Sequence, residues 1–381
     1  MIGAFALVLR AISQHPLGVR MSTAIHNGSG NGSVPAVSPI LVSVVIPAYQ
    51  CSGYIAEAIR SVRAQSYPAH EILVVNDGSP DTEALEQALA QYMSVIRYIK
   101  QENGGPSSAR NRGVRESRGN YVAFLDSDDL WFSNHLAKQV ALFQEDPSLA
   151  LVYSNSLSLE GDTPVGTAFE KHPQDLNVTF ENLVAERCTV GTSTVVASRR
   201  AILESGGFED RRRRSEDFDL WLRMAHRGFK MSYSSSVQVC HRAGNGLAED
   251  DNVMKQSQIA VYEKALLTLP VTGPQAELIC NKTQELQGRL QVEMTKESLR
   301  HQRFAEALES AKQAQKILPS TKTAVAVFGL KFFPRGMGAA YRMYERCLER
   351  KQNRRQVRFQ SIEKSSDSKL GYEAFSEFAE K

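Results

Sequence analysis

The 381-residue sequence contains no hydrophobic run long enough to cross a membrane. A helix that spans a bilayer needs about 20 mostly apolar residues. Residues 1–9 are largely apolar, but Arg10 ends that run, and the second apolar stretch, 321–333, contains Lys331. No basic stretch precedes the first run, as a secretory signal would require. We therefore expect a cytoplasmic protein without a membrane span.

Cysteine pairs and an excess of one charge are also missing. The five cysteines, at positions 51, 188, 240, 280 and 347, are odd in number and form no CxxC pair. Neither a zinc site nor a disulfide framework is therefore predicted. The 45 basic and 42 acidic side chains leave a net charge of only +3. Because this balance gives no whole-surface attraction to nucleic acid, we expect no nucleic-acid partner.

Composition and pattern divide the chain into four parts. Residues 22–39 are rich in Ser, Gly, Asn and Pro, a composition that buries too little apolar surface to fold. From Val253 onward the sequence consists of long helical stretches rich in Ala, Gln, Glu, Lys and Leu. We predict a flexible leader (1–39), an α/β domain (40–250), a helical C-terminal region (251–358) and a tail (359–381).

Short apolar strands alternate with helices across the predicted α/β domain. The runs LVSVVIPAY, EILVVND and YVAFLD are typical of buried strands, and segments with helical spacing separate them. This alternation predicts βαβ units and a doubly wound, mostly parallel sheet. Three of the predicted strands end in polar clusters, at 47–50, 76–79 and 126–129. Because ligands bind beyond the carboxyl ends of such strands, this edge of the sheet is the candidate site.

Three carboxylates within four positions form the sharpest local signal. In FLDSDDLW, a predicted strand is followed by Asp126, Asp128 and Asp129. Carboxylates this close repel one another unless a cation or hydrogen-bond donors compensate, and hard oxygen ligands suit Mg²⁺ or Mn²⁺. The alternative is that residues 127–129 only cap the helix that follows. The segment alone leaves both interpretations open.

Two polar turns could contact a nucleotide. Asp77 lies two positions after a run of four apolar residues, 72–75, and its carboxylate could accept the ring N–H of uracil, thymine or guanine. In ENGGPSSARNRG, a glycine turn leads into a helix with Arg110 and Arg112, and helix amides and guanidinium groups both suit phosphate oxygens. The alternatives are a turn with backbone needs of its own and a solvated basic helix. The missing Gly-Lys-Ser/Thr ending argues against a P-loop and ATP hydrolysis.

Acidic residues precede another predicted helix, within RRRRSEDFDLWLRMAHRG. Glu216, Asp217 and Asp219 follow four arginines and precede an apolar helix face. A carboxylate near both a cation and an apolar wall could act as a general base for a hydroxyl group. The alternative is that these charges only match the helix macrodipole. His241, which follows a strand-like run, is a lone histidine of the kind that is more often structural than a ligand.

The helical region contains a basic segment. Lys331 to Arg358 carries nine basic and two acidic side chains, interspersed with aromatic residues. Basic amphipathic segments of this kind bind anionic membrane surfaces. RNA contact and simple solvation are the alternatives at this stage.

Six motifs in one order resemble glycosyltransferase family 2. They are VSVVIPAYQ, EILVVNDGS, GGPSSARNRG, YVAFLDSDDLW, GGFED and EDFDLWLR, within residues 41–245. One such motif would be weak, whereas six in order are specific. The resemblance implies the GT-A fold, a doubly wound α/β sheet, here with a C-terminal helical appendage.

The resemblance also implies roles on the donor side of a site. Asp77 matches the aspartate that reads the base, and Arg110 matches a position that lines the nucleotide site. The first nucleotide-contact segment of the family is matched by Pro47, Ala48 and Tyr49.

The remaining implied roles concern the metal, the base and the acceptor. Asp126 and Asp128 match the DxD motif, with Asp128 as the more direct metal ligand and Asp126 nearer the ribose. Asp217 matches the catalytic base of the ED motif, and Glu216 either supports it or touches the acceptor. In some relatives, the position of His241 contacts the diphosphate or the metal. Acceptor-side segments contain Thr192, Ser193 and Gly207.

The implied activity is that of a metal-dependent, inverting hexosyltransferase with Mn²⁺ or Mg²⁺ as cofactor. It would move a sugar from a nucleotide-diphosphate sugar, in the first place a UDP-sugar, to a hydroxyl of a saccharide or lipid-linked acceptor. The expected process is cell-surface polysaccharide or glycolipid synthesis, at the inner face of the membrane. A sugar-phosphate nucleotidyltransferase would need a glycine-rich, Arg-containing loop where this chain has PAYQCSGY. A non-catalytic nucleotide-sugar-binding module would have no use for the base Asp217.

Overall fold

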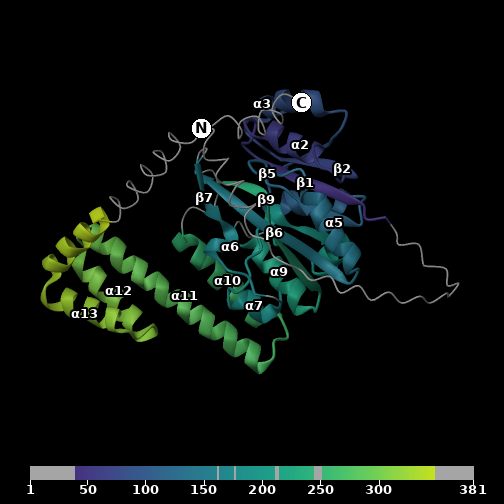
Figure 1. Ribbon diagram of the computed structural model, residues 1–381. Coiled ribbons are helices and arrows are strands. Elements are labelled where there is room, and N and C mark those ends of the chain that lie inside the picture. The colour runs from purple at the N-terminus through teal and green to yellow at the C-terminus, as the bar shows by residue number, and fades with distance from the viewer. Residues whose placement is uncertain (1–38, 161–162, 176, 211–213, 244–250, 348–381) are drawn as a thin grey trace, which may run out of the picture. The chain divides into compact units, whose positions relative to one another are not determined.

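The computed structural model describes residues 39–160, 163–175, 177–210, 214–243 and 251–347. The predicted leader up to residue 38, residues 348–358 of the basic segment and the predicted tail therefore lie outside the described residues. In the described part of the chain, a sheet of nine strands forms the centre of the fold (Figure 1). The strands are β1 (Val42–Ala48), β2 (Glu71–Asp77), β3 (Arg97–Gln101), β4 (Tyr121–Phe124), β5 (Leu130–Trp131), β6 (Leu149–Glu160), β7 (Thr163–Thr167), β8 (Val196–Ser198) and β9 (Lys230–Ala243).

Helices cover both faces of the sheet. Alternate residues of β1 belong to two different hydrophobic clusters, because Val45 packs on one face while Val44 and Ile46 pack on the other. The helices and 3₁₀ turns are α2 (Ile55–Arg63), α3 (Thr82–Leu89), η1 (Ala90–Tyr92), α4 (Pro106–Glu116), α5 (His135–Glu145), α6 (Ala168–Lys171), α7 (Phe180–Val184), η2 (Thr192–Thr194), α8 (Arg199–Glu204), α9 (Glu216–His226), α10 (Asp251–Thr268), α11 (Gly273–Arg300), α12 (Phe304–Ile317) and α13 (Thr321–Phe332).

The first half of the sheet is parallel. Strand β1 pairs in parallel with β2 and β4, and β2 pairs in parallel with β3. The register places Ala48 opposite Asn76 and Asp77 opposite Gln101, so the polar strand ends lie at one edge. The α/β alternation of the sequence and the doubly wound sheet are confirmed in this half.

The second half of the sheet is mixed, with the overall strand order β3-β2-β1-β4-β8-β6-β9-β5 and β7 paired to β6. Strand β8 is antiparallel to β4 and β6, whereas β6 and β9 are parallel. The antiparallel entry of β8 brings the preceding turn η2 to the end of β4, where the amide of Phe124 donates to the carbonyl of Val195. A turn distant in sequence thereby lies beside the first aspartates.

The predicted helical C-terminal region is present. Helices α10 and α11 contribute Ile259, Tyr262, Ile279 and Leu286 to the same hydrophobic cluster as the sheet. The hydroxyl of Tyr262 also donates to the carbonyl of Val184 in α7 at 3.0 Å. These helices therefore bury apolar surface of the sheet domain, and the boundary at 250/251 stays a prediction.

Residues Ile40–Ala339 form one compact unit, and the described helical residues 340–347 belong to another. Among the described residues, we found no helix that is both long and apolar enough to cross a membrane.

Candidate active site

The three aspartates after β4 have different surroundings. Asp129 is 1% exposed, and its Oδ1 lies 2.9 Å from Nδ1 of His241 and accepts the amide of Arg242 at 3.2 Å. This hydrogen bond raises the pKa of His241 to about 9, so the ring is cationic at neutral pH. Asp129 is therefore occupied in joining the aspartate loop to β9, whereas Asp126 and Asp128 are only partly buried.

Arg110 joins two motifs that are far apart in sequence. Its guanidinium donates to Asp126 Oδ1 through Nη2 and to Glu216 Oε1 through Nη1, each at 2.7 Å. The side chain is only 6% exposed, and it lies over the ring of Phe208 at 5.6 Å. Both carboxylates raise the pKa of Arg110, against the effect of burial. One guanidinium group thus bridges Asp126 of the DxD motif and Glu216 of the ED motif.

A second link between the motifs comes from adjacent residues of η2. The hydroxyl of Ser193 accepts the amide of Asp126 at 3.0 Å, and the hydroxyl of Thr192 donates to Asp217 Oδ2 at 2.8 Å. The carbonyl of Ser193 is in turn fixed by the indole N–H of Trp131 at 2.8 Å. Thr192 and Ser193, which the sequence predicts to lie near the sugar acceptor, therefore each form a hydrogen bond with one aspartate, Asp217 and Asp126 respectively.

Asp217 is the second residue of helix α9, and its Oδ1 accepts the amide of Phe218 at 2.7 Å. Burial raises the pKa of Asp217 to about 6, and the charge of Glu216 adds to the increase, whereas the Thr192 hydrogen bond opposes it. A carboxylate with this pKa is ionised at neutral pH and is more basic than an ordinary aspartate. These are the properties of a general base.

Asp77 closes the glycine turn before α4. Its Oδ1 accepts the side-chain amide of Gln101 at 2.7 Å and the N–H of Gly104 at 2.9 Å, and its Oδ2 accepts the N–H of Gly105 at 2.7 Å. Gly105 has a φ of 86°, a conformation that glycine adopts without strain. Three hydrogen bonds thus join Asp77 to the segment before α4, acceptor capacity remains on Oδ2, and its role in reading the nucleobase stays a prediction.

The loop after β1 lies beside this turn. Pro47 and Ala48 end the strand, and Tyr49 is 46% exposed. The amide of the next residue, Gln50, donates to the hydroxyl of Ser79 at 2.7 Å. This hydrogen bond joins the segment after β1 to the turn that follows Asp77, at the ends of the two strands.

Gly207 holds the GGFED turn. Its φ is 70°, and a Cβ there would lie 2.6 Å from Oδ1 of Asn111. Asn111 accepts the amide of Phe208 and donates to its carbonyl, each at 2.8 Å. Gly207 therefore leaves room for Asn111, which fixes Phe208 against Arg110. A contact of Gly207 with the sugar acceptor stays a prediction.

The predicted metal ligands are Asp128, Asp126 and His241. In the described part of the chain, no three His, Cys, Asp or Glu side chains are grouped closely enough to hold a metal ion. Burial raises the pKa of Asp128 to about 6, and the charges of Asp129 and Asp126 add to the increase. Magnesium-type ions need one or two carboxylates, with phosphate oxygens and water as the other ligands, and the Asp126–Asp128 pair fits that requirement.

Arg242 is a site residue that sequence reasoning missed. Its Nη1 donates to the carbonyl of Asp128 at 3.0 Å, its guanidinium lies over the ring of Tyr54 at 5.3 Å, and it pairs with Glu57. It therefore connects the aspartate loop to the start of α2. Its position directly after His241 was the one signal available, because its partners are distant in sequence.

The chain is similar to known proteins in sequence and in fold. The family model "Glycosyl transferase family 2" matches residues 43–243. A putative teichuronic acid biosynthesis glycosyltransferase, TuaG of Bacillus subtilis, is 32% identical over 194 residues, which are 50% of this chain and 73% of the relative. The UDP-Glc:alpha-D-GlcNAc-diphosphoundecaprenol beta-1,3-glucosyltransferase WfaP of Escherichia coli is 28% identical over 240 residues, which are 59% of this chain and 90% of the relative.

Other curated relatives are longer, and the match to this chain spans only 31% of their length. Among solved structures, the mannosyltransferase PcManGT of Pyrobaculum calidifontis, in complex with GDP-Man and Mn²⁺, has a TM-score of 0.53 at 17% identity. The similarity covers 90% of this chain and 94% of that one. The expected GT-A fold is thereby confirmed. Because the family model matches more than half of the chain and its motifs meet at one edge of the sheet, the chain belongs to glycosyl transferase family 2.

Proposed function

We propose that the protein is an inverting glycosyltransferase that moves a sugar from a nucleotide-diphosphate sugar to an acceptor hydroxyl. The observation that carries the proposal is the double connection between the DxD and ED motifs. Arg110 binds Asp126 and Glu216, and adjacent residues of η2 bind Asp126 and Asp217. A donor bound at the first motif would therefore lie beside a basic carboxylate of the second.

On the donor side, the nucleobase of the donor would contact Asp77 and the segment Pro47, Ala48 and Tyr49. The free acceptor capacity of Asp77 Oδ2 suits the ring N–H of uracil, thymine or guanine. A UDP-sugar is the first candidate, because the name of the relative WfaP specifies UDP-Glc. Arg110 and Asp126 would then lie near the ribose and the diphosphate.

A Mn²⁺ or Mg²⁺ ion would be held by Asp128 and the second oxygen of Asp126, with His241 as the third candidate. Nδ1 of His241 faces Asp129, so Nε2 would be the ligating atom, and it would have to lose its proton to bind the ion. When bound, such an ion stabilises the charge that develops on a nucleoside diphosphate as it leaves. Arg242 holds the carbonyl of Asp128 and so orients this loop for the donor.

Asp217 would accept the proton of the acceptor hydroxyl. The hydroxyl oxygen forms the new bond to the anomeric carbon, while the bond from that carbon to the phosphate oxygen breaks and its electron pair leaves with the nucleoside diphosphate. Thr192 and the amide of Phe218 orient the carboxylate. Glu216 acts through Arg110, which keeps it 2.7 Å from the guanidinium. No protein nucleophile is required in a single displacement of this kind.

The acceptor would lie near Thr192, Ser193 and Gly207, and it would be a saccharide or a lipid-linked sugar. The names of TuaG and WfaP, which specify teichuronic acid biosynthesis and a diphosphoundecaprenol-linked substrate, support cell-surface polysaccharide or glycolipid synthesis. With such an acceptor, the protein would work in the cytoplasm at the inner face of the membrane. The predicted contact of Lys331 to Arg358 with that membrane belongs to the same proposal.

Calorimetry with UDP, dTDP and GDP, with and without Mn²⁺, tests the donor side. We expect Asp128→Ala to abolish the gain in affinity that Mn²⁺ provides, while Asp146→Ala, a surface control beside Lys230, leaves it intact. An unchanged Mn²⁺ dependence in Asp128→Ala would contradict the metal assignment. Release of nucleoside diphosphate from a panel of nucleotide sugars and saccharide or lipid-linked acceptors tests turnover. Tight donor binding without turnover would instead support a non-catalytic module.

A further inference from the structure

Helix α13 presents a row of large apolar side chains to solvent. Val325, Phe328 and Phe332 are spaced by three and four residues, which places them on one face of the helix. They are 62%, 60% and 55% exposed, and Phe333 at the helix end is 65% exposed. Four of the fifteen large hydrophobic side chains exposed in the described part of the chain therefore lie between residues 325 and 333. Apolar patches of this kind mark interaction sites.

The exposed face belongs to a well-anchored helix. On the opposite side of α13, Leu330 is 2% exposed. On the side of the row, Gly329 packs closely, because a Cβ there would lie 2.5 Å from the sulfur of Met337. At the N-terminus, Ser320 and Thr323 form a capping box. The aromatic rings of Phe328 and Phe332 contact each other with centroids 4.8 Å apart. The row is therefore held in place while it faces water.

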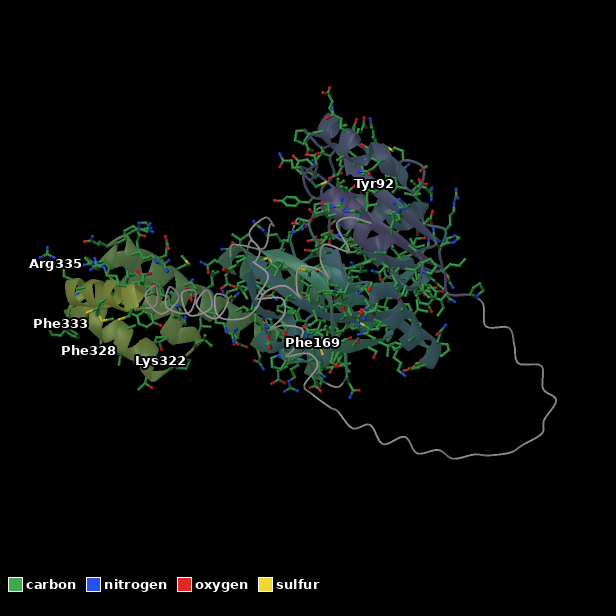
Figure 2. All side chains as sticks on the ribbon, turned by 45° about the horizontal axis from the view of Figure 1, so that its top comes forward. Tyr92, Phe169, Lys322, Phe328, Phe333 and Arg335 are labelled. Atoms are coloured by element: carbon green, nitrogen blue, oxygen red, sulfur yellow. The ribbon has the colours of Figure 1, made fainter. Side chains whose placement is uncertain are left out.

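The charged residues next to this row in the sequence are all basic. Lys322, Lys331 and Arg335 are exposed, and Nζ of Lys331 lies 5.3 Å from the ring centroid of Phe332. The sequence contains no acidic residue between Ser310 and Tyr344. Figure 2 shows the side chains of Lys322, Phe328, Phe333 and Arg335 along the outer side of this part of the chain.

We propose that this surface docks onto an anionic lipid membrane. The surface, called here the α13 face, consists of Lys322, Val325, Phe328, Lys331, Phe332, Phe333 and Arg335. Aromatic side chains that insert at the lipid headgroup level, next to lysines and arginines that pair with anionic headgroups, are the pattern of interfacial helices. A second copy of the chain would present the same positive charges, so face-to-face pairing would bring like charges together. This inference deepens the membrane contact that we propose above for Lys331 to Arg358, and vesicle binding can be tested separately from catalytic activity.

Flotation of the full-length protein with lipid vesicles tests this proposal. Vesicles of phosphatidylcholine alone are compared with vesicles that also contain phosphatidylglycerol, at low and high salt. We expect binding to the anionic vesicles and weak binding to the neutral ones. High salt should weaken the binding, because it screens the interaction of exposed charges. A wild-type protein that binds neither kind of vesicle would overturn the proposal.

Two variants separate the apolar and the charged contributions. Replacement of Lys322, Lys331 and Arg335 by Gln should weaken binding to the anionic vesicles by roughly fivefold for each side chain. Phe328→Ser with Phe332→Ser should weaken it by at least about tenfold. Leu267→Ser with Met294→Ser is the matched apolar control, because both residues are exposed on other helices, and it should bind like the wild type.

Nucleotide binding by calorimetry reports whether each variant has folded, and it should be unchanged in all three. Binding to anionic vesicles that is equal in the wild type and both α13 variants would overturn the proposal. So would dimers, measured by light scattering, that disappear in the Phe328→Ser, Phe332→Ser variant, because a second copy of the chain would then cover the face.

Discussion

The candidate active site and the α13 face use charge in opposite ways. In the site, the positive charge of Arg110 is buried and contacts two carboxylates, each at 2.7 Å. On the α13 face, Lys322, Lys331 and Arg335 are exposed and the surrounding sequence contains no acidic residue. Charges that neutralise one another inside the protein hold the groups of the candidate site in place, whereas exposed charges of one sign remain available to an external partner.

The largest expected effect is that of Asp217→Asn on turnover. Removal of the base should lower kcat by about 10²–10⁴-fold, measured as release of nucleoside diphosphate, while donor affinity and vesicle binding stay unchanged. The folded state raises the pKa of Asp217 from 3.8 to about 6, so its ionised form destabilises the fold fully above pH 6 and not at all below about pH 4. Asn cannot ionise, and we expect it to increase the free energy of unfolding at neutral pH by about 1–2 kcal/mol. Full activity in this variant would contradict the assignment of Asp217 as the general base.

Arg110→Met should be the most destabilising substitution in the site. It leaves Asp126 and Glu216 without their common partner, and the loss of one member of a buried ion pair costs about 3–5 kcal/mol. Arg112→Met is the matched control on the same helix, because Arg112 forms an exposed pair with Glu116 that contributes less than about 1 kcal/mol. Urea unfolding measures both. Equal losses would show that the bridge does not stabilise the site.

Gly207→Ala should destabilise the fold by about 1–2 kcal/mol, because Gly207 has a φ of 70° and L-residues in the left-handed region are strained. The added methyl group would also displace Asn111, which holds Phe208 beneath Arg110, so the turnover rate should fall with stability. Gly53→Ala is the control, since nothing lies within 4 Å of its Cβ position. Thermal unfolding and turnover of the two variants provide the comparison.

The two regions should also differ in their response to pH. Turnover requires the ionised form of Asp217, whose pKa is about 6, so kcat/KM should fall about tenfold for each pH unit below that value. Binding to anionic vesicles depends on lysine and arginine, which stay charged at these pH values, and it should change little. Parallel measurements between pH 5 and 8 test this. A turnover rate that is flat across the range would contradict the assignment of Asp217.

The smallest expected effect on turnover is that of Gly288→Ala in α11. A Cβ on Gly288 would lie 2.4 Å from Cγ of Leu318, so the substitution pushes α11 and α12 apart at a cost of about 1–3 kcal/mol. Donor affinity and turnover should remain within about twofold of the wild type, because the described contacts of the site do not include this pair. A loss of turnover comparable to that of Gly207→Ala would show that the C-terminal helices control catalysis.

The local sequence pattern was sufficient to predict the positions of some residues of the site, but not of others. The strands ending at Ala48, Asp77 and Phe124 were predictable because apolar runs between helices indicate a parallel sheet, and such a sheet aligns its strand ends. The positions of Thr192, Ser193 and Arg242 were not predictable by this reasoning. They depend on the antiparallel entry of β8 and on the long strand β9, and their partners lie many residues away.

The sequence by itself determined the α/β sheet, the helical C-terminal region and the six motifs, because strand and helix periodicity and turn chemistry act over short distances. Only the tertiary structure decided which charged groups compensate one another. It assigned Asp129 to His241, Arg110 to Asp126 and Glu216, and Thr192 to Asp217. It also decided that the aromatic residues of α13 face water while Leu330 is buried. Long-range electrostatics and burial depend on which segments meet in space, and no local pattern encodes that.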